Sequence, residues 1–172
     1  MSATPLPAPV LAALPDLVRR LAIILAGLAA QIAHSLLRDP KRVGFIVPLY
    51  YRILRAARRF ERLTLRLAAG EPARPARPGR RGGKPPVRLP QAHGWLAAVG
   101  WQVRGYGCQL EYLLSDPAMV ELLAAEPRAV RIFRPLCRLL GLRPAALPPL
   151  PRRPPRAARR QATAYSTRVC RN

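Results

Sequence analysis

The sequence predicts a mainly α-helical protein, built from an N-terminal helical hairpin and a small C-terminal three-helix module. Apolar residues recur at three- and four-residue steps in two blocks, and 12 of the 21 prolines of this 172-residue chain lie with arginines between and after those blocks. The expected organisation is a disordered start (1–9), the hairpin (10–70), a Pro/Arg-rich linker (71–90), the compact helical module (91–143) and a disordered basic tail (144–172). Blocks of this size hold only small cores, so a catalytic domain with a deep cleft is not expected.

The first helix is expected to begin at Val10 and to end at Asp39–Pro40, because proline disfavours the α conformation in the residue before it. One face of this helix is apolar throughout: Leu17, Leu21, Ile24, Leu25, Leu28, Ile32 and Leu36.

The stretch Leu21–Leu37 carries no charge, which leaves three interpretations open. It is a soluble helix that is buried or self-associates, or it enters a membrane, since 17 residues is the lower limit for crossing a ~30 Å hydrocarbon layer. The third interpretation is an export signal, because Arg19–Arg20 before an apolar run resembles a twin-arginine leader. Asp16 upstream and the lack of a small-x-small cleavage site oppose it.

The second helix is expected from Pro48 to Gly70, with an apolar seam at heptad spacing. Leu49, Ile53, Ala56, Phe60, Leu63 and Leu67 form the seam, and six arginines occupy the other faces: Arg52, Arg55, Arg58, Arg59, Arg62 and Arg66. The seam is expected to pack on the first helix. The arginines are either a solvated face or a binding surface for an anionic partner, and they are the candidate site residues.

The linker 71–90 contains six prolines, three glycines and six basic residues, so it cannot bury a core. The tail from Pro144 has the same character and is expected to be disordered.

In the second block a helix is expected from Gly94–Trp95, in which Gly100, Gly105 and Gly107 either let another backbone approach closely or mark a break near residue 105. Asp116–Pro117 and Glu126–Pro127 are expected to start two further helices, with an acidic cap followed by proline at the first helical position. Most of the aromatic surface of this block comes from Trp95, Trp101, Tyr106 and Tyr112. The two tryptophans fall off the apolar seam, so they either complete the core from a second side or stand exposed to anchor a partner.

Two runs of this block, Gly105–Pro127 and Arg134–Gly141, resemble a segment of small uncharacterised basic proteins of GC-rich alphaproteobacteria. The resemblance implies no activity, ligand or site residue. It supports treating 91–143 as one unit.

The net charge is +22, with 28 arginines and 2 lysines. Arginine binds phosphate and carboxylate bidentately, which favours a phosphate-bearing partner. Codon bias in a GC-rich genome explains the same excess without any binding role, and the sequence does not separate the two explanations.

No catalytic, metal or cofactor motif is present. The cysteines lie too far apart for a zinc site, and Cys108 and Cys137 fall on apolar faces, where a free cysteine acts as a small hydrophobe. His34 and His93 have no ligand-spaced neighbours. We therefore expect neither an enzyme nor a bound cofactor.

The sequence thus favours a non-enzymatic helical interaction protein that binds an anionic partner, nucleic acid or an acidic protein, without sequence specificity. The alternative is a membrane-associated protein, anchored by the 21–37 helix with the basic helix on anionic lipid headgroups. A homo-oligomer formed through the heptad seams is a further option. The expected location is cytoplasmic, or at the membrane in the alternative.

Overall fold

The computed structural model describes residues 6–70, 89–145 and 147. In this part of the chain there are five α-helices and one 3₁₀ helix, and no strand: α1 (Ala8–Leu37), η1 (Val43–Phe45), α2 (Ile46–Ala68), α3 (Trp101–Leu114), α4 (Pro117–Ala125) and α5 (Pro127–Leu140). The predicted mainly α fold is confirmed. The expectations for residues 1–5, for most of the linker and for nearly all of the tail lie outside the described residues.

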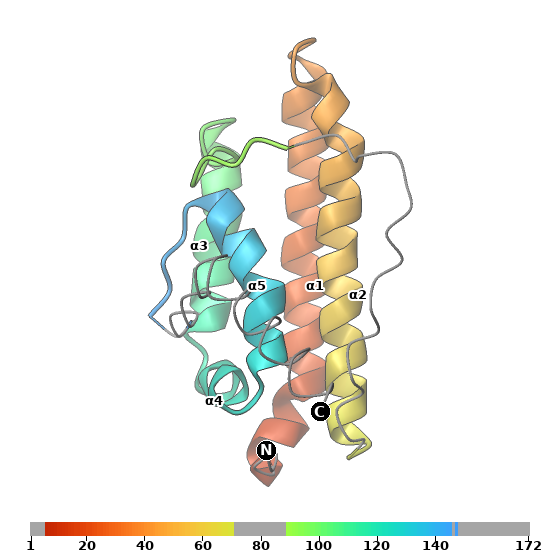
Figure 1. Ribbon diagram of the computed structural model, residues 1–172, viewed down its shortest axis with the longest axis vertical. Helices are drawn as coiled ribbons and strands as arrows, with labels where there is room; N and C mark the ends of the chain where they lie inside the picture. Colours follow the sequence, from red (N-terminus) through yellow and green to blue (C-terminus); the bar gives the residue numbers. More distant parts are fainter. Residues whose placement is uncertain (1–5, 71–88, 146, 148–172) are drawn as a thin grey trace, which may run out of the picture.

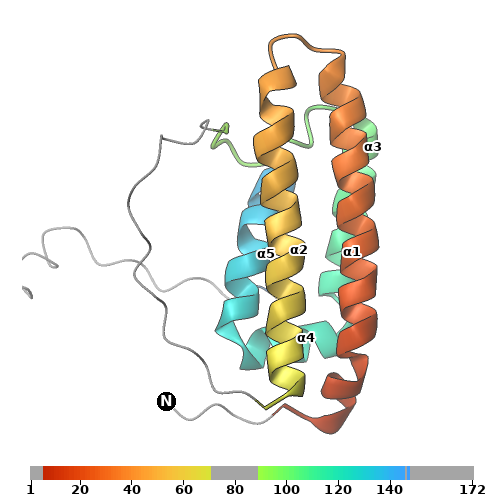
Figure 2. The ribbon, with the colours of Figure 1, turned by 90° about the vertical axis from the view of Figure 1, so that its right-hand side faces the viewer.

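Four of the helices form a bundle in which every neighbouring pair is antiparallel (Figures 1 and 2). α1 and α2 form the predicted hairpin, α3 packs on α1, α5 packs on α2, and α3 and α5 close the ring. α4 crosses one end of the bundle, where it contacts α1, α3 and α5. Helices from the two blocks of sequence therefore pack against each other in one bundle.

The buried face of α1 is the predicted one. All seven apolar residues expected there are buried, and Val10 and Leu14 extend the face toward the N-terminus. The helix begins at Ala8, so Pro9 belongs to its first turn and not to the preceding segment, because the first turn has no intrahelical partner for the N–H that proline lacks.

α2 begins at Ile46, directly after η1, so Pro48 lies inside its first turn and not at its first position as expected. Leu49, Ile53 and Phe60 of the predicted seam are at most 3% exposed. The last helical residue is Ala68, and Gly70 follows in the predicted capping role, with φ +63° and its N–H donated to the Leu67 carbonyl at 3.2 Å.

The expectation of a helix from Gly94 is wrong, because α3 begins only at Trp101. Gly94 has φ +69°, a left-handed conformation that interrupts a helix, and its N–H donates to the Arg138 carbonyl at 2.9 Å. Leu96 donates to the Leu139 carbonyl at 3.2 Å. The segment before α3 is thus held by the end of α5, and Leu89, placed in the linker from sequence, is buried against the core.

Once started, α3 is continuous through Gly105, so the break considered there is absent. The close approach occurs instead on α1. A Cβ added at Gly27 would lie 2.5 Å from Cε1 of Tyr106, so only glycine leaves room for that ring.

The predicted starts of α4 and α5 are confirmed. The Asp116 side chain accepts the Ala118 N–H at 3.1 Å, and the Glu126 side chain accepts the Arg128 N–H at 2.9 Å. Gly141, with φ +79°, is the C-cap of α5.

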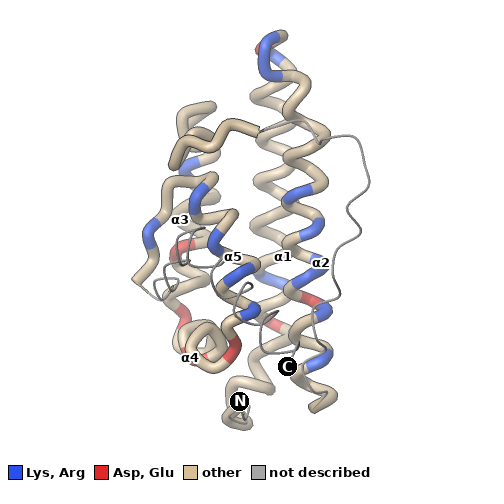
Figure 3. The backbone as a smooth tube through the Cα atoms, in the orientation of Figure 1, with Lys and Arg blue, Asp and Glu red and all other residues tan. Residues whose placement is uncertain are grey.

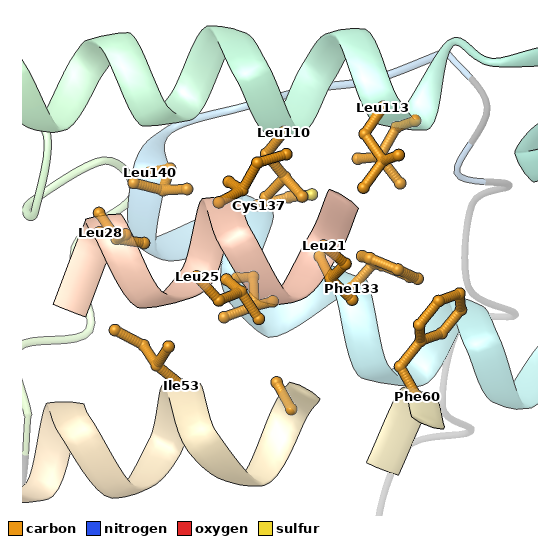
Figure 4. Close-up of a cluster of buried hydrophobic side chains, with 14 of the residues drawn as sticks. Leu21, Leu25, Leu28, Ile53, Phe60, Leu110, Leu113, Phe133, Cys137 and Leu140 are labelled. Carbon is orange, nitrogen blue, oxygen red and sulfur yellow. The ribbon is translucent and has the colours of Figure 1, made fainter. Parts of the chain in front are cut away.

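One hydrophobic core unites both blocks of sequence (Figure 4). Within it the rings of Phe60 and Phe133, both fully buried, meet edge to face with centroids 5.1 Å apart. At the end of the bundle Arg20 of α1 donates to Asp116 at 2.8 Å. Whether the two apolar blocks contact each other was left open by the sequence, and in the structure they share one hydrophobic core.

Candidate anion-binding groove

A groove lined by arginines runs between the antiparallel helices α2 and α5. It consists of two adjoining hollows of about 330 and 190 Å³, which share Arg59, Arg131 and Ile132. Its lining is Arg52, Arg55, Ala56, Arg59, Arg62, Leu63 and Arg66 from α2, with Arg128, Arg131, Ile132, Pro135 and Leu136 from α5. We call this the α2–α5 groove, and Figure 3 shows the basic residues of both helices.

The α2 wall follows from the spacing of its arginines. Arg52, Arg55, Arg59, Arg62 and Arg66 alternate three- and four-residue steps, so they share one stripe of a helix with 3.6 residues per turn. This stripe lies next to the buried seam, because Ala56 and Leu63 line the same groove. Packing of the seam on the core therefore fixes where the arginine stripe faces.

The α5 wall repeats the pattern. Arg128, Arg131 and Pro135 again stand three and four residues apart, and Ile132 and Leu136 supply the apolar floor. Arginine side chains can lay their methylene stems along such a floor while the guanidinium stays in water. The floor thus supports the two rows of cations that flank it.

Few described carboxylates lie close to the arginines of the groove. The described residues form ion pairs at Arg19 with Asp16, Arg20 with Asp16 and Asp116, and Arg42 with Asp39, all outside the groove. No described carboxylate lies within 4.0 Å of the groove arginines 52, 55, 59, 62, 66 or 131. Like charges held this close repel one another, so an anion in the groove would be stabilised.

Five of the six candidate arginines line the groove, and Arg58 does not. Arg58 falls off the three-four stripe and is exposed on another side of α2. Arg128 and Arg131 were not among the residues predicted for the site. Their spacing gave a detectable signal, but only the packing of α5 on α2 makes them part of a site.

The other chemistry-bearing residues are dispersed. Among the described residues no group of three or more His, Cys, Asp or Glu could hold a metal ion. Cys137 is buried as expected, and burial raises the pKa of its thiol to about 12. The expectation that Cys108 is buried is wrong, because its side of α3 faces solvent; both cysteines are free thiols.

Cys108 lines a second, mostly apolar hollow of about 470 Å³ between α1 and α3, together with Arg20, Ile23, Ile24, Gln109 and Tyr112. Its one cation is already paired: Arg20 binds Asp116 and lies 5.9 Å from the centroid of the Tyr112 ring. This hollow therefore offers no free charge to a ligand.

The aromatic residues divide between the two roles considered. Trp95 is half-buried and meets Phe45 edge to face at 6.0 Å, and Tyr106 is half-buried against Gly27. Trp101 and Tyr112 are 77% and 75% exposed, and neither lines the α2–α5 groove.

Within the described residues, none of the helices combines the length and apolarity needed to cross a bilayer. The 21–37 stretch lies in α1, whose buried apolar side chains face the protein core. Insertion of this helix into a membrane would therefore expose much of that core.

Comparison of the chain with protein-family models, with curated proteins and with solved structures found no match.

Proposed function

We propose that this protein is a non-enzymatic binding protein that holds a polyanion, nucleic acid above all, in the α2–α5 groove. The observation that carries the proposal is the pair of facing arginine rows, of which six members have no described carboxylate within 4.0 Å. The net charge of +22 adds long-range attraction for the same class of partner.

The shape of the array favours a linear polymer. From Arg52 to Arg66 the α2 row spans 14 residues, or about 21 Å at 1.5 Å per residue. Cations repeated along such a line suit a chain that carries anions at regular intervals. Phosphates bound to guanidinium groups release condensed counterions, which drives the association.

The same lining argues against sequence readout. Apart from arginine, the described residues of the lining are only Ala, Leu, Ile and Pro, so among them there is no aromatic ring for a base to stack on and no side-chain amide for a base edge. We therefore expect contacts to the phosphate backbone and little preference among bases.

The test compares two full-length variants that lose the same charge. Arg59→Gln/Arg131→Gln removes one cation from each wall of the groove, whereas Arg38→Gln/Arg104→Gln removes two exposed cations elsewhere. Binding of a labelled single-stranded oligonucleotide is measured by fluorescence anisotropy. At 0.1 M salt each lost phosphate contact should lower log K for binding by ~0.7. The loss of two contacts should therefore weaken binding about 25-fold.

The control pair should weaken binding much less, since distant exposed charges are screened. Equal losses in both variants would refute the groove as the binding site. Polyglutamate is the second arm: if it displaces the oligonucleotide as well as unlabelled oligonucleotide does at equal charge, the partner class is an acidic protein and not nucleic acid.

A further inference from the structure

A second regular stripe runs along the side of α2 that faces away from the protein. Its members alternate four- and three-residue steps, as the buried seam does. They are Val47, Tyr51, Leu54, Arg58, Glu61, Leu65 and Ala68, which we call the outer stripe. Every four-three repeat of this kind places its residues in one line on the helix surface.

The outer stripe is apolar at its ends and open to solvent. Val47 and Tyr51 are both 61% exposed and Leu65 is 64% exposed, which is unusual for large apolar side chains on one helix. In Figure 2, where α2 stands in front, no other described helix covers this side. No other described helix therefore covers the stripe, and Leu54 is its one half-buried member among otherwise exposed residues.

The centre of the stripe carries one charge of each sign. Arg58 and Glu61 are its only charged members, and Glu61 is the only carboxylate of α2. Although they stand three residues apart, they form no ion pair with each other, and no described cation lies within 4.0 Å of Glu61. Each is thus available to a partner that presents the opposite charge at the matching position.

We propose that a second copy of this chain binds the outer stripe, with the two α2 helices antiparallel about a two-fold axis that passes between residues 59 and 60. This register sets Arg58 opposite the partner's Glu61, Leu54 opposite the partner's Leu65 and Tyr51 opposite the partner's Ala68. The symmetry repeats each pair, so two ion pairs form at the centre and apolar pairs flank them.

Charge selects this arrangement over the parallel one. In a parallel pair Arg58 would face the partner's Arg58 and Glu61 the partner's Glu61, and like charges at facing positions are repelled. The antiparallel register pairs every member from Tyr51 to Ala68 with a compatible residue. One helix pair makes a small interface, so we expect reversible dimerisation and not a permanent dimer.

Charge reversal provides the test, with molar mass measured by light scattering after size exclusion and by sedimentation velocity over a range of concentrations. The wild-type protein should approach twice its 19.0 kDa as concentration rises. Glu61→Arg and Arg58→Glu should each stay monomeric, because each sets like charges opposite one another. The double variant Arg58→Glu/Glu61→Arg should dimerise again, since the two ion pairs return with their signs exchanged.

Glu121→Arg, which reverses an exposed carboxylate on α4, is the matched control and should dimerise like the wild type. Far-ultraviolet circular dichroism and thermal unfolding confirm that each variant is folded. A wild-type protein that stays monomeric at every concentration would overturn the proposal, and so would a dimer that neither single reversal weakens. The measurement uses no polyanion, so its outcome is independent of the function proposed for the groove.

Discussion

The salt dependence of polyanion binding reports how many groove arginines contact phosphate. Each contact to single-stranded nucleic acid contributes about −0.7 to the slope of log K against log salt. The seven arginines that line the α2–α5 groove would together contribute a slope of about −5, which corresponds to a nearly 1,000-fold loss of affinity between about 50 and 200 mM salt. Basic residues elsewhere in the chain add to the total, so the informative quantity is a difference between proteins.

Replacing Arg59 and Arg131 by glutamine should make the slope shallower by about 1.4, twice the contribution of one contact. Anisotropy titrations at several salt concentrations, on the wild type and this variant, give both slopes. Arg38→Gln/Arg104→Gln should leave the slope within about 0.3 of the wild type, since these residues line no part of the groove. If the groove variant had the same slope as the wild type, Arg59 and Arg131 would not contact phosphates, even if the variant bound more weakly.

Three further predictions concern the fold and are checked by urea denaturation. Phe133→Ala should lower the free energy of unfolding by about 3–5 kcal/mol, whereas Trp101→Ala, at a residue 77% exposed, should change it by no more than about 0.5 kcal/mol; similar effects would contradict the assigned core. Gly105→Ala should raise it by up to about 1 kcal/mol, because a methyl there meets nothing within 4 Å, and Gly27→Ala should lower it, because its methyl would lie 2.5 Å from a tyrosine ring. The pKa of the Cys137 thiol is about 12 in the folded protein, against an ordinary value of 9.0, so the unfolded chain loses this proton at lower pH than the folded one. The stability that the thiol contributes is therefore lost as pH rises from 9 toward 12, and Cys137→Ala should flatten that loss. If the free energy of unfolding fell equally with pH in the wild type and the variant, the thiol would be in water.

The helices were largely predictable because their signals are local. The seam of α2 from Leu49 to Leu63 and the face of α1 follow directly from helical periodicity, and both are buried. Asp116 and Glu126 cap the helices they were expected to cap, because an acidic side chain before proline satisfies N–H groups of the first turn wherever it occurs. Such features need no knowledge of the rest of the fold.

The errors arose where a distant segment decides the local structure. Residues 94–100 have a helical pattern, yet the hydrogen bond from Gly94 to the Arg138 carbonyl and the left-handed glycine hold them in turns. Leu89 lies in a proline-rich stretch but is buried by the bundle. Cys108 was expected on an apolar face, but it lies on the exposed side of α3.

The groove shows the same division between local and long-range information. Its α2 wall was identified as a set of arginines, although Arg58 was included with them, because charge on one helix is visible in the sequence. Its α5 wall was missed, because Arg128 and Arg131 acquire a role only when α5 packs beside α2. A surface shared by two helices requires their packing to be known.

Each groove arginine of α2 follows an outer-stripe residue by one position, so the groove and the outer stripe lie on adjacent sides of the helix. A two-fold axis that relates two side-by-side antiparallel helices is perpendicular to their common plane, so a row on one side of that plane is on the same side in the second copy. The dimer would therefore present the α2 walls of both grooves on one face. A polyanion long enough to reach both would bind with the gain of a bivalent ligand.

For Glu61→Arg, this geometry predicts a change in polyanion affinity opposite to the change expected from net charge alone. Glu61→Arg adds two positive charges per chain and should therefore bind any polyanion more tightly if charge alone matters. If the dimer presents both grooves together, the same variant should bind a long oligonucleotide more weakly than the wild type does, by about tenfold or more. A short oligonucleotide that fills one groove should not be weakened. Stronger binding of Glu61→Arg to both lengths would show that the two copies do not act together on one strand.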